Sequence, residues 1–200
     1  MTNPIEALGD DPLAIFIEWH GMATATAPDP DAAVLATATS SGAPSARHVL
    51  LRGIDHDGVR FFSGYDSRKG RELAENPRAA VAWFDPVARR AVRLEGAVQR
   101  LEAADSDAYW ATRERGHQLS AVASLQSSPL ADRAQLEHAY LEAEHRFQGR
   151  PVERPARWGG YLLVPGCMEL WLQRDDRLHD RFCYTREATG APWSAVRLAP

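Results

Sequence analysis

The segment Arg177-Leu178-His179-Asp180-Arg181, close to the C-terminus, carries the side chains best suited to chemistry. In an extended strand alternate side chains share a face, so Arg177, His179 and Arg181 would lie together. Two guanidinium groups around an imidazole repel one another unless an anionic or electron-rich group lies against them. The segment therefore predicts a ligand-facing cationic surface or, as the simpler alternative, the exposed charged edge of a strand.

A second candidate site is the segment Ser67-Arg68-Lys69-Gly70, which follows an expected strand and opens an expected short helix. Ser67 is a residue type that caps helices. Free backbone N–H groups at the start of the helix, together with Arg68 and Lys69, could bind a phosphate. Lys69 is the only lysine among 23 basic residues, a mild indication that this position prefers an ammonium group. The alternative is a capped surface helix with solvated charges.

Three further groups could contribute to a site. Arg47 and Arg52 are five positions apart and point to opposite faces of a regular strand, so one ligand could meet both only through a bulge or a strand end. Tyr109 and Arg113 are four apart on an expected helix and could grip an anion together. The dipeptide Gln126-Ser127 offers amide and hydroxyl groups at a helix end. For each group alone, an ordinary structural role is the simpler alternative.

Composition narrows the classes of protein to consider. The chain has 200 residues, 44% of them hydrophobic and 25% charged, as in one globular domain. A formal net charge of −4 gives no basic field of the kind that nucleic-acid-binding proteins use. No apolar run reaches the length of a membrane span, and the N-terminus lacks the pattern of a signal peptide. Cys167 and Cys183 lack metal-ligand spacing and suit a reducing compartment. We expect a cytoplasmic protein with no nucleic-acid, membrane or metal partner.

Apolar periodicity and turn residues predict strands toward both ends of the chain, with helices between them. A first helix should begin at Asp11-Pro12, where an aspartate precedes a proline at the first helical position. Strands are expected at 33–39, 45–54, 58–64, 79–84, 91–101, 157–165, 167–173, 177–186 and 192–200, and helices at 103–115, 117–125 and 130–147. Short strands of this kind favour an antiparallel barrel or sandwich. We expect one mainly β domain over 1–200 with interposed helices, in which 1–10 form a flexible arm.

Eight short motifs, in order and spacing, connect the chain to a known family. They are R-x-V-L-L-R (47–52), F-F-S-G-Y-x-S-R-K-G (61–70), E-N-P-R-A-A (75–80), Q-S-S (126–128), W-G-G-Y (158–161), E-L-W (169–171), R-L-H-D-R-F (177–182) and R-L-x-P (197–200). From about residue 11 to 200 the chain resembles the pyridoxamine 5′-phosphate oxidase family. The resemblance implies a Greek-key split β-barrel homodimer with FMN at the subunit interface. It also implies that pyridoxamine or pyridoxine 5′-phosphate transfers a hydride to FMN, which O2 reoxidises to give H2O2.

The resemblance also implies a role for individual residues. It assigns to the flavin Arg47, His48, Val49, Leu50, Leu51, Arg52, Phe62, Ser63, Arg68, Lys69, Gln126, Ser127, Trp171 and Arg181. It assigns to the substrate Arg52, Tyr109, Arg113, His117, Arg177 and His179. Arg177 and His179 would be the catalytic pair, because a positive, hydrogen-bonding wall can orient the carbon that loses hydride.

Four departures from the family pattern affect mainly the substrate site. Arg52 stands where the family usually has lysine, Ala91 replaces a glutamine near the flavin, and His117 replaces a serine of the phosphate grip. The N-terminal arm is short and lacks the family's arginine and tyrosine before Pro12. A second hypothesis is therefore an FMN-dependent oxidase of another reduced ring or amine in secondary metabolism, as in the related phenazine-biosynthesis oxidases. A third is a flavin-binding protein with little turnover.

Overall fold

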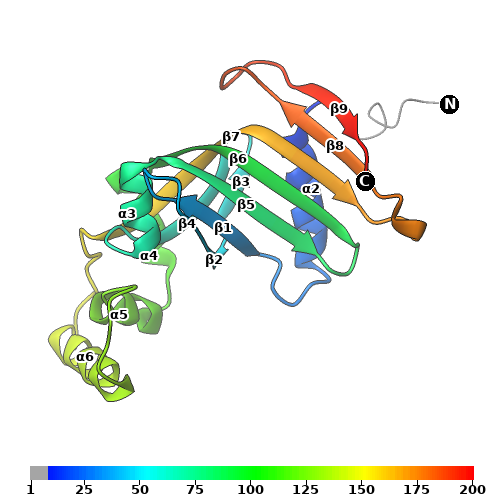
Figure 1. Ribbon diagram of the computed structural model, residues 1–200. Helices are drawn as coiled ribbons and strands as arrows, with labels where there is room; N and C mark the ends of the chain where they lie inside the picture. Colours follow the sequence, from blue (N-terminus) through cyan, green and yellow to red (C-terminus); the bar gives the residue numbers. More distant parts are fainter. Residues whose placement is uncertain (1–8) are drawn as a thin grey trace.

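The computed structural model describes residues 9–200, so the expected flexible arm at 1–10 lies almost wholly outside the described part (Figure 1). Within it, nine antiparallel strands form one sheet in the order β2-β1-β5-β6-β7-β4-β3, with β8 beside β7 and β9 beside β8. The strands are β1 (Ala32–Ala38), β2 (Pro44–Leu50), β3 (Gly53–Asp55), β4 (Gly58–Gly64), β5 (Arg78–Asp85), β6 (Arg90–Arg100), β7 (Trp158–Leu172), β8 (Asp180–Thr185) and β9 (Ser194–Leu198). The helices are α2 (Pro12–Thr24), α3 (Arg68–Glu75), α4 (Ala103–Thr112), α5 (Arg115–Ala123), α6 (Arg133–Arg146) and the short 3-10 helix η1 (Asp175–Arg177).

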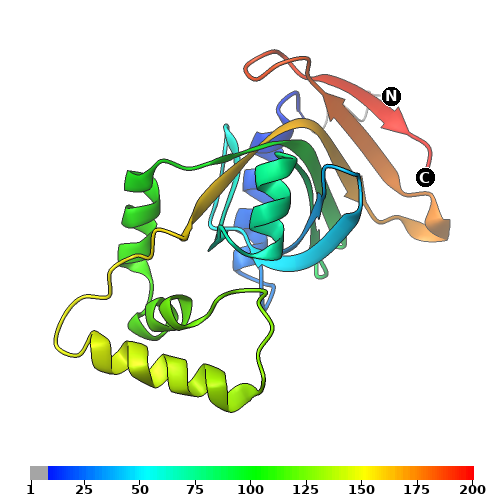
Figure 2. The same ribbon diagram turned by 60° about the vertical axis from the view of Figure 1, so that its left-hand side comes forward.

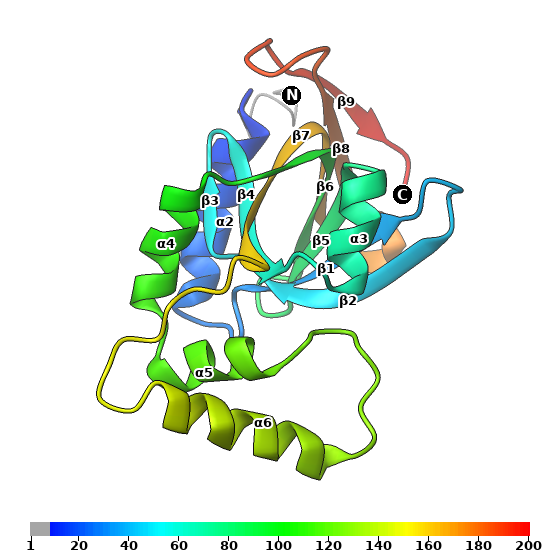
Figure 3. The same cartoon turned by 90° about the vertical axis from the view of Figure 1, so that its left-hand side faces the viewer.

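The sheet divides at β7. One edge of β7 pairs with β6 from Tyr161 to Leu172, with a bulge at Glu95/Gly96. On the other edge, residues 158–163 pair with β4 and residues 167–172 pair with β8. The strands next to β4 curl into a half-barrel, whereas the β8–β9 hairpin extends from its side (Figures 1 and 3). This arrangement confirms the expected split barrel, with β7 as one continuous strand rather than the two expected.

The first helix forms as the sequence predicts. Asp11 is the N-cap of α2, and its side chain accepts a hydrogen bond from the backbone N–H of Leu13 at 2.9 Å. Pro12 occupies the first turn, where its missing N–H costs no intrahelical bond. The helix buries Phe16 and Trp19 in the core of the half-barrel, and the Phe16 ring lies 5.3 Å from that of Trp83.

The helices α4, α5 and α6 form a lobe with its own small core. Figure 2 shows α5 and α6 next to each other, away from the β8–β9 hairpin. The buried side chains of this second cluster are Trp110, Leu119, Ala143, Phe147, Val152 and Trp158. Because Trp158 is the first residue of β7, the lobe is anchored where β7 starts beside β4. No helix among residues 9–200 is long and apolar enough to cross a bilayer.

The strand expected at 45–54 is wrong, because the chain changes pairing partner within it. β2 ends at Leu50, and the backbone N–H of Leu51 bonds to the carbonyl of Asp31 before β1. The next N–H, that of Arg52, bonds to the carbonyl of Arg60 in β4. These two residues, with different partners, separate β2 from β3.

The expectation that Arg177, His179 and Arg181 share one strand face is also wrong. β8 begins only at Asp180, and Arg177 ends η1 with a left-handed φ of 61°. The side chain of Arg174 pairs with Asp180 at 2.7 Å, and its backbone N–H donates to Nδ1 of His179 at 3.2 Å. These contacts close a compact loop, which places Arg177 and His179 on irregular backbone, whereas Arg181 lies within β8.

Candidate functional site

A cavity of about 240 Å³ gathers side chains from five separate segments of the chain. It is lined by His48, Val49, Leu50, Arg52, Phe62, Ser63, Lys69, Tyr109, Arg113 and Gln126, all of them among the predicted flavin or substrate contacts. A second cavity of about 1000 Å³ shares part of this wall, including Phe62 and Gln126. Small-molecule pockets commonly measure roughly 300–1,000 Å³, so the smaller cavity by itself encloses only part of a ligand.

Lys69 carries a buried positive charge into this cavity. Its side chain is 5% exposed, and Nζ donates to the Oγ atoms of Ser63 at 2.8 Å and Ser67 at 3.2 Å. Burial, and then the charge of Arg47, lower the pKa of Lys69 to about 8, while Glu72 acts in the opposite direction. The hydroxyl partners cannot neutralise an ammonium group, so an anion in the cavity would find a strong donor.

The start of α3 adds its backbone dipole beside Lys69. Ser67 is the N-cap, as predicted, and its Oγ accepts from the backbone N–H of Gly70 at 3.3 Å. A Cβ atom on Gly70 would lie 2.0 Å from the carbonyl oxygen of Tyr65. Only glycine lets the helix start this close to the end of β4, so the spacing of the S-R-K-G motif has a steric reason.

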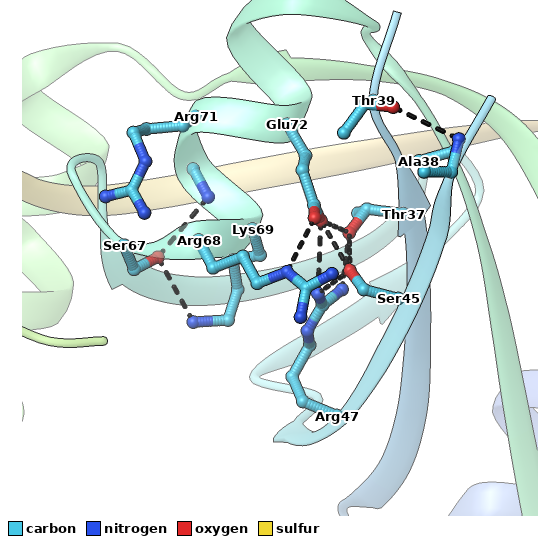
Figure 4. Close-up of polar contacts among 12 residues, drawn as sticks. Thr37, Ala38, Thr39, Ser45, Arg47, Ser67, Arg68, Lys69, Arg71 and Glu72 are labelled. Carbon is cyan, nitrogen blue, oxygen red and sulfur yellow. Dashed lines mark hydrogen bonds and ion pairs between the residues drawn. The ribbon is translucent and has the colours of Figure 1, made fainter. Parts of the chain in front are cut away.

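Arg47 and Arg68 do not line the cavity but meet at the carboxylate of Glu72 (Figure 4). Oε2 of Glu72 accepts from Ser45 at 2.6 Å, from Thr37 at 2.5 Å and from Nη2 of Arg47 at 3.2 Å, and Oε1 accepts from Nε of Arg68 at 2.9 Å. Burial of Glu72 opposes ionisation, but these hydrogen bonds outweigh it and lower the pKa to about 2. The carboxylate is therefore ionised and held by four donors.

Sequence reasoning missed Glu72. Its one local signal was the four-residue spacing from Arg68 on a helix, which brings opposite charges together. Its other partners, Thr37, Ser45 and Arg47, come from β1 and β2, so only the tertiary fold reveals the cluster.

Aromatic rings form one wall of the cavity. The Phe62 ring stacks on Tyr109 with centroids 3.8 Å apart and on Trp158 with centroids 5.7 Å apart. The guanidinium carbon of Arg113 lies 4.8 Å from the Trp158 centroid. A Cβ atom on Gly160 would lie 2.7 Å from Phe62, so the W-G-G-Y motif leaves room for this ring.

One N–H donor of Arg113 makes no hydrogen bond within the described part of the chain. Its Nη2 donates to the carbonyl of His117 at 2.9 Å, but its buried Nε has no hydrogen-bond partner among the described residues. Burial lowers the pKa of Arg113, and Tyr109 partly opposes this. Tyr109 and Arg113 both line the cavity, although Arg113 is the C-cap of α4 rather than a residue within the helix. The His117 side chain is 67% exposed and lies outside the cavity.

Gln126 reaches the cavity from the loop after α5. Its Oε1 accepts from Oγ of Ser63 at 2.9 Å and from the backbone N–H of Gly64 at 3.2 Å, so its amide N–H groups remain available to a ligand. Ser127 has a left-handed φ of 72° and does not line the cavity. Leu51 packs in the barrel core with 2% exposure.

The remaining predicted residues lie together elsewhere, around the start of β8. Trp171, Arg177, His179 and Arg181 line neither cavity. The His179 ring lies 4.6 Å from the Trp171 ring. Arg181 donates to both carboxylate oxygens of Glu169, at 2.7 and 3.0 Å. The predicted site residues thus fall into two groups, and β8 lies at the other end of the sheet from α4–α6 (Figure 1).

Comparison with known proteins now identifies the family. A family model described as pyridoxamine 5′-phosphate oxidase matches residues 23–147. The chain belongs to the pyridoxamine 5′-phosphate oxidase family. A second model, the pyridoxine 5′-phosphate oxidase C-terminal dimerisation region, matches residues 158–200, which include β7, β8 and β9.

Several relatives named as pyridoxine/pyridoxamine 5′-phosphate oxidases match this chain over nearly its whole length. A pyridoxine/pyridoxamine 5′-phosphate oxidase of Rubrobacter xylanophilus is 49% identical over 95% of this chain and 87% of the relative. One of Gluconobacter oxydans is 42% identical over 98% of each chain. The crystal structure of PhzG from Burkholderia lata 383, in complex with tetrahydrophenazine-1-carboxylic acid, has a TM-score of 0.89 and 34% identity, over 96% of this chain and 94% of that one. These similarities support an oxidoreductase.

The described residues fit the flavin mononucleotide that the pyridoxamine 5′-phosphate oxidase family implies. The buried ammonium of Lys69, held by hydroxyl groups, suits a phosphate monoester. The amide N–H groups of Gln126 and the backbone of β2 offer the hydrogen-bonding groups that a flavin ring requires. Arg47 and Arg68 stand behind this site on Glu72.

Proposed function

We propose that the protein is an FMN-dependent oxidase of pyridoxamine and pyridoxine 5′-phosphates, which yields pyridoxal 5′-phosphate. The observation that carries the proposal is that one cavity holds the ammonium of Lys69 and the guanidinium of Arg113, whose Nε has no partner among the described residues, whereas Arg52 in the same wall is paired with Asp31. Two phosphates have to be bound in this reaction, one of the cofactor and one of the substrate. The curated relatives named for these substrates are 42–49% identical, which supports the same assignment.

The residues have distinct roles in this proposal. Lys69, Ser67 and the start of α3 bind the cofactor phosphate, and residues 48–50 of β2 run along the ring system. Tyr109 and Arg113 bind the substrate phosphate, because a guanidinium fork matches its oxygens. When bound, FMN would accept hydride from the carbon that bears the amine or alcohol and pass the electrons to O2, giving H2O2.

A second copy of the chain would complete the site. The cavity of about 240 Å³ is smaller than an ordinary small-molecule pocket, and the dimerisation region carries the second group of predicted residues. We infer a homodimer with FMN at the interface, in which Trp171 and Arg181 contact the cofactor. Arg177 and His179 then face the substrate and orient the carbon that loses hydride.

A second candidate is the oxidation of an unphosphorylated reduced ring. The observation in its favour is that His117, which replaces a serine of the family's phosphate grip, does not line the cavity and has a side chain that is 67% exposed. The set of side chains that would bind a substrate phosphate then lacks one member. The structural similarity to PhzG, solved with a tetrahydrophenazine carboxylic acid, agrees with this alternative.

Oxygen uptake with a panel of substrates tests both candidates. FMN-loaded protein is supplied with pyridoxine 5′-phosphate, pyridoxamine 5′-phosphate, pyridoxine and tetrahydrophenazine-1-carboxylic acid. We expect turnover of the two phosphorylated vitamers, and a much higher KM for pyridoxine. Turnover of the tricyclic acid alone would favour the second candidate, and turnover of none would indicate a flavin-binding protein without this oxidase activity.

A further inference from the structure

Glu72 is a buried acid behind a cavity that should bind an anion. Its side chain is 5% exposed, and it accepts hydrogen bonds from four side chains on three elements. An acid so close to a phosphate site would ordinarily weaken anion binding. Its presence there calls for a physical reason.

The reason lies in the charges that surround it. Arg47 and Arg68 both pair with Glu72, at 3.2 and 2.9 Å, and the charges of Arg47 and Glu72 both act on Lys69. Figure 4 shows the three cationic side chains near the start of α3, with the guanidinium groups of both arginines directed at the Glu72 carboxylate. Without an anion, three positive charges in a partly buried cluster repel one another.

Glu72 also fixes the geometry of the cluster. Its two oxygens receive Arg47 and Arg68 separately, and the hydroxyl groups of Thr37 and Ser45 hold Oε2 in place. The contacts connect β1, β2 and α3, which are distant in sequence. A guanidinium held in this way loses little further freedom when an anion arrives.

We propose that Glu72 is a positioning residue and internal counter-ion of the phosphate site: it holds Arg47 and Arg68 in place and offsets part of the cationic charge, so that the site keeps its shape without ligand and binds anions less tightly than its cations alone would. The inference deepens the proposed function, because the anion in question is the phosphate of FMN. Glu72 stabilises the apoprotein and moderates its affinity for the cofactor.

Removal of the Glu72 charge should lower the stability of the apoprotein but raise its affinity for FMN. A merely structural residue would lower both, so the two measurements together separate the proposal from a structural role. Glu72→Gln removes the charge and keeps an oxygen acceptor of the same shape. We expect the Tm of the apoprotein to fall by roughly 4–8 °C, because charge-assisted bonds in the cluster are weakened. We expect the Kd for FMN at low salt to fall roughly fivefold, because the net charge of the cluster becomes more positive by one.

The experiment uses the full chain freed of flavin. Apo Tm, the Kd for FMN from quenching of flavin fluorescence, and the Tm shift in inorganic phosphate are measured at several salt concentrations. Glu75→Gln is the matched control, because Glu75 is exposed on the same helix and contacts Ser40 rather than the cluster. It should leave all three values close to those of the wild type. The affinity gain of Glu72→Gln should shrink as salt rises.

Unchanged or weaker binding of FMN and phosphate by Glu72→Gln, with a lower apo Tm, would overturn the proposal. If this variant does not fold, the double variant Arg68→Gln/Glu72→Gln decides, because it restores the net charge of the cluster and Arg68 is 61% exposed. A folded double variant supports the counter-ion role, and failure of both variants to fold overturns it. A wild type that takes up no FMN refutes the proposed function, whereas the apo Tm and phosphate measurements still decide the role of Glu72.

Discussion

The Nζ atom of Lys69 lies 2.8 Å from the Oγ atom of Ser63, and the same hydroxyl donates to Gln126 at 2.9 Å. This chain of bonds joins α3, β4 and the loop after α5 at one edge of the cavity. Both contacts of the Ser63 hydroxyl are with neutral or cationic groups, so they leave the charge of Lys69 uncompensated. The relationship explains why a phosphate ester suits this cavity.

Lys69→Met should separate cofactor binding from stability. We expect the Kd for FMN to rise roughly 10- to 100-fold, because a charge-assisted hydrogen bond to phosphate is lost. The apo Tm should not fall, because burial already disfavours the charged ammonium, as its lowered pKa indicates. Fluorescence titration and thermal unfolding measure the two effects. Arg71→Met, on the same helix but outside the smaller cavity, is the control. Equal affinity of Lys69→Met and wild type would remove Lys69 from the site.

FMN affinity should depend on pH through Lys69. Its pKa of about 8 means that the ammonium is charged below pH 8 and loses its proton above it. The phosphate of FMN is a dianion above its second pKa of about 6. Affinity should therefore be greatest between about pH 6 and 8 and fall as pH rises further. Lys69→Arg should flatten this fall, since guanidinium keeps its proton. A wild-type Kd that is constant up to about pH 9.5 would contradict the assignment.

Arg113→Gln should affect the substrate more than the cofactor. We expect the KM for pyridoxine 5′-phosphate to rise roughly 10- to 100-fold, with FMN affinity within about twofold of wild type. Tyr109→Phe keeps the stack on Phe62 and removes only the hydroxyl, so its effect on KM should be smaller. Steady-state kinetics on FMN-loaded protein check both. A large loss of FMN affinity in Arg113→Gln, with KM unchanged, would place Arg113 at the cofactor instead.

Two glycine substitutions should change stability in opposite directions. Gly70→Ala places a Cβ atom 2.0 Å from the carbonyl oxygen of Tyr65, so α3 must shift. We expect a loss of about 2 kcal/mol or more in the free energy of unfolding, together with weaker FMN binding. Gly21→Ala meets nothing within 4 Å in the exposed part of α2 and should gain about 0.5–1 kcal/mol. Denaturant unfolding of the apoproteins measures both, and a stable Gly70→Ala with wild-type FMN affinity would refute the steric argument.

Local signals predicted much of the fold. The pair Asp11-Pro12 marked the start of α2, and the alternation around Val81 and Trp83 marked β5, because capping and face alternation are decided within a few residues. The break after Leu50 could not be predicted, because it arises when the chain changes its pairing partner from β1 to β4. The loop around Arg177 depends on the contact of Arg174 with Asp180, which alternation does not reveal.

The site was predicted in part for the same reason. Lys69 and the start of α3 could be inferred from residue types, and the motif resemblance supplied Phe62 and Gln126. The resemblance placed both His48 and Arg47 at the flavin, but His48 lines the cavity, whereas its neighbour Arg47 contacts Glu72. Neighbouring side chains of a strand point to opposite faces, and Arg47 is on the face that meets Glu72. Because Glu72 is 25 residues away in the sequence, local residue types do not reveal which of the two side chains enters the cavity.

Single-turnover mixing under anaerobic conditions tests the central claim most directly. FMN-loaded protein is mixed with excess pyridoxine 5′-phosphate without O2, and the visible absorption of the flavin is followed while pyridoxal 5′-phosphate is quantified. The account predicts that the flavin band bleaches as one equivalent of pyridoxal 5′-phosphate forms, and that admitting O2 restores the band. A flavin that stays oxidised in the presence of both phosphorylated vitamers, with no pyridoxal 5′-phosphate formed, would contradict it.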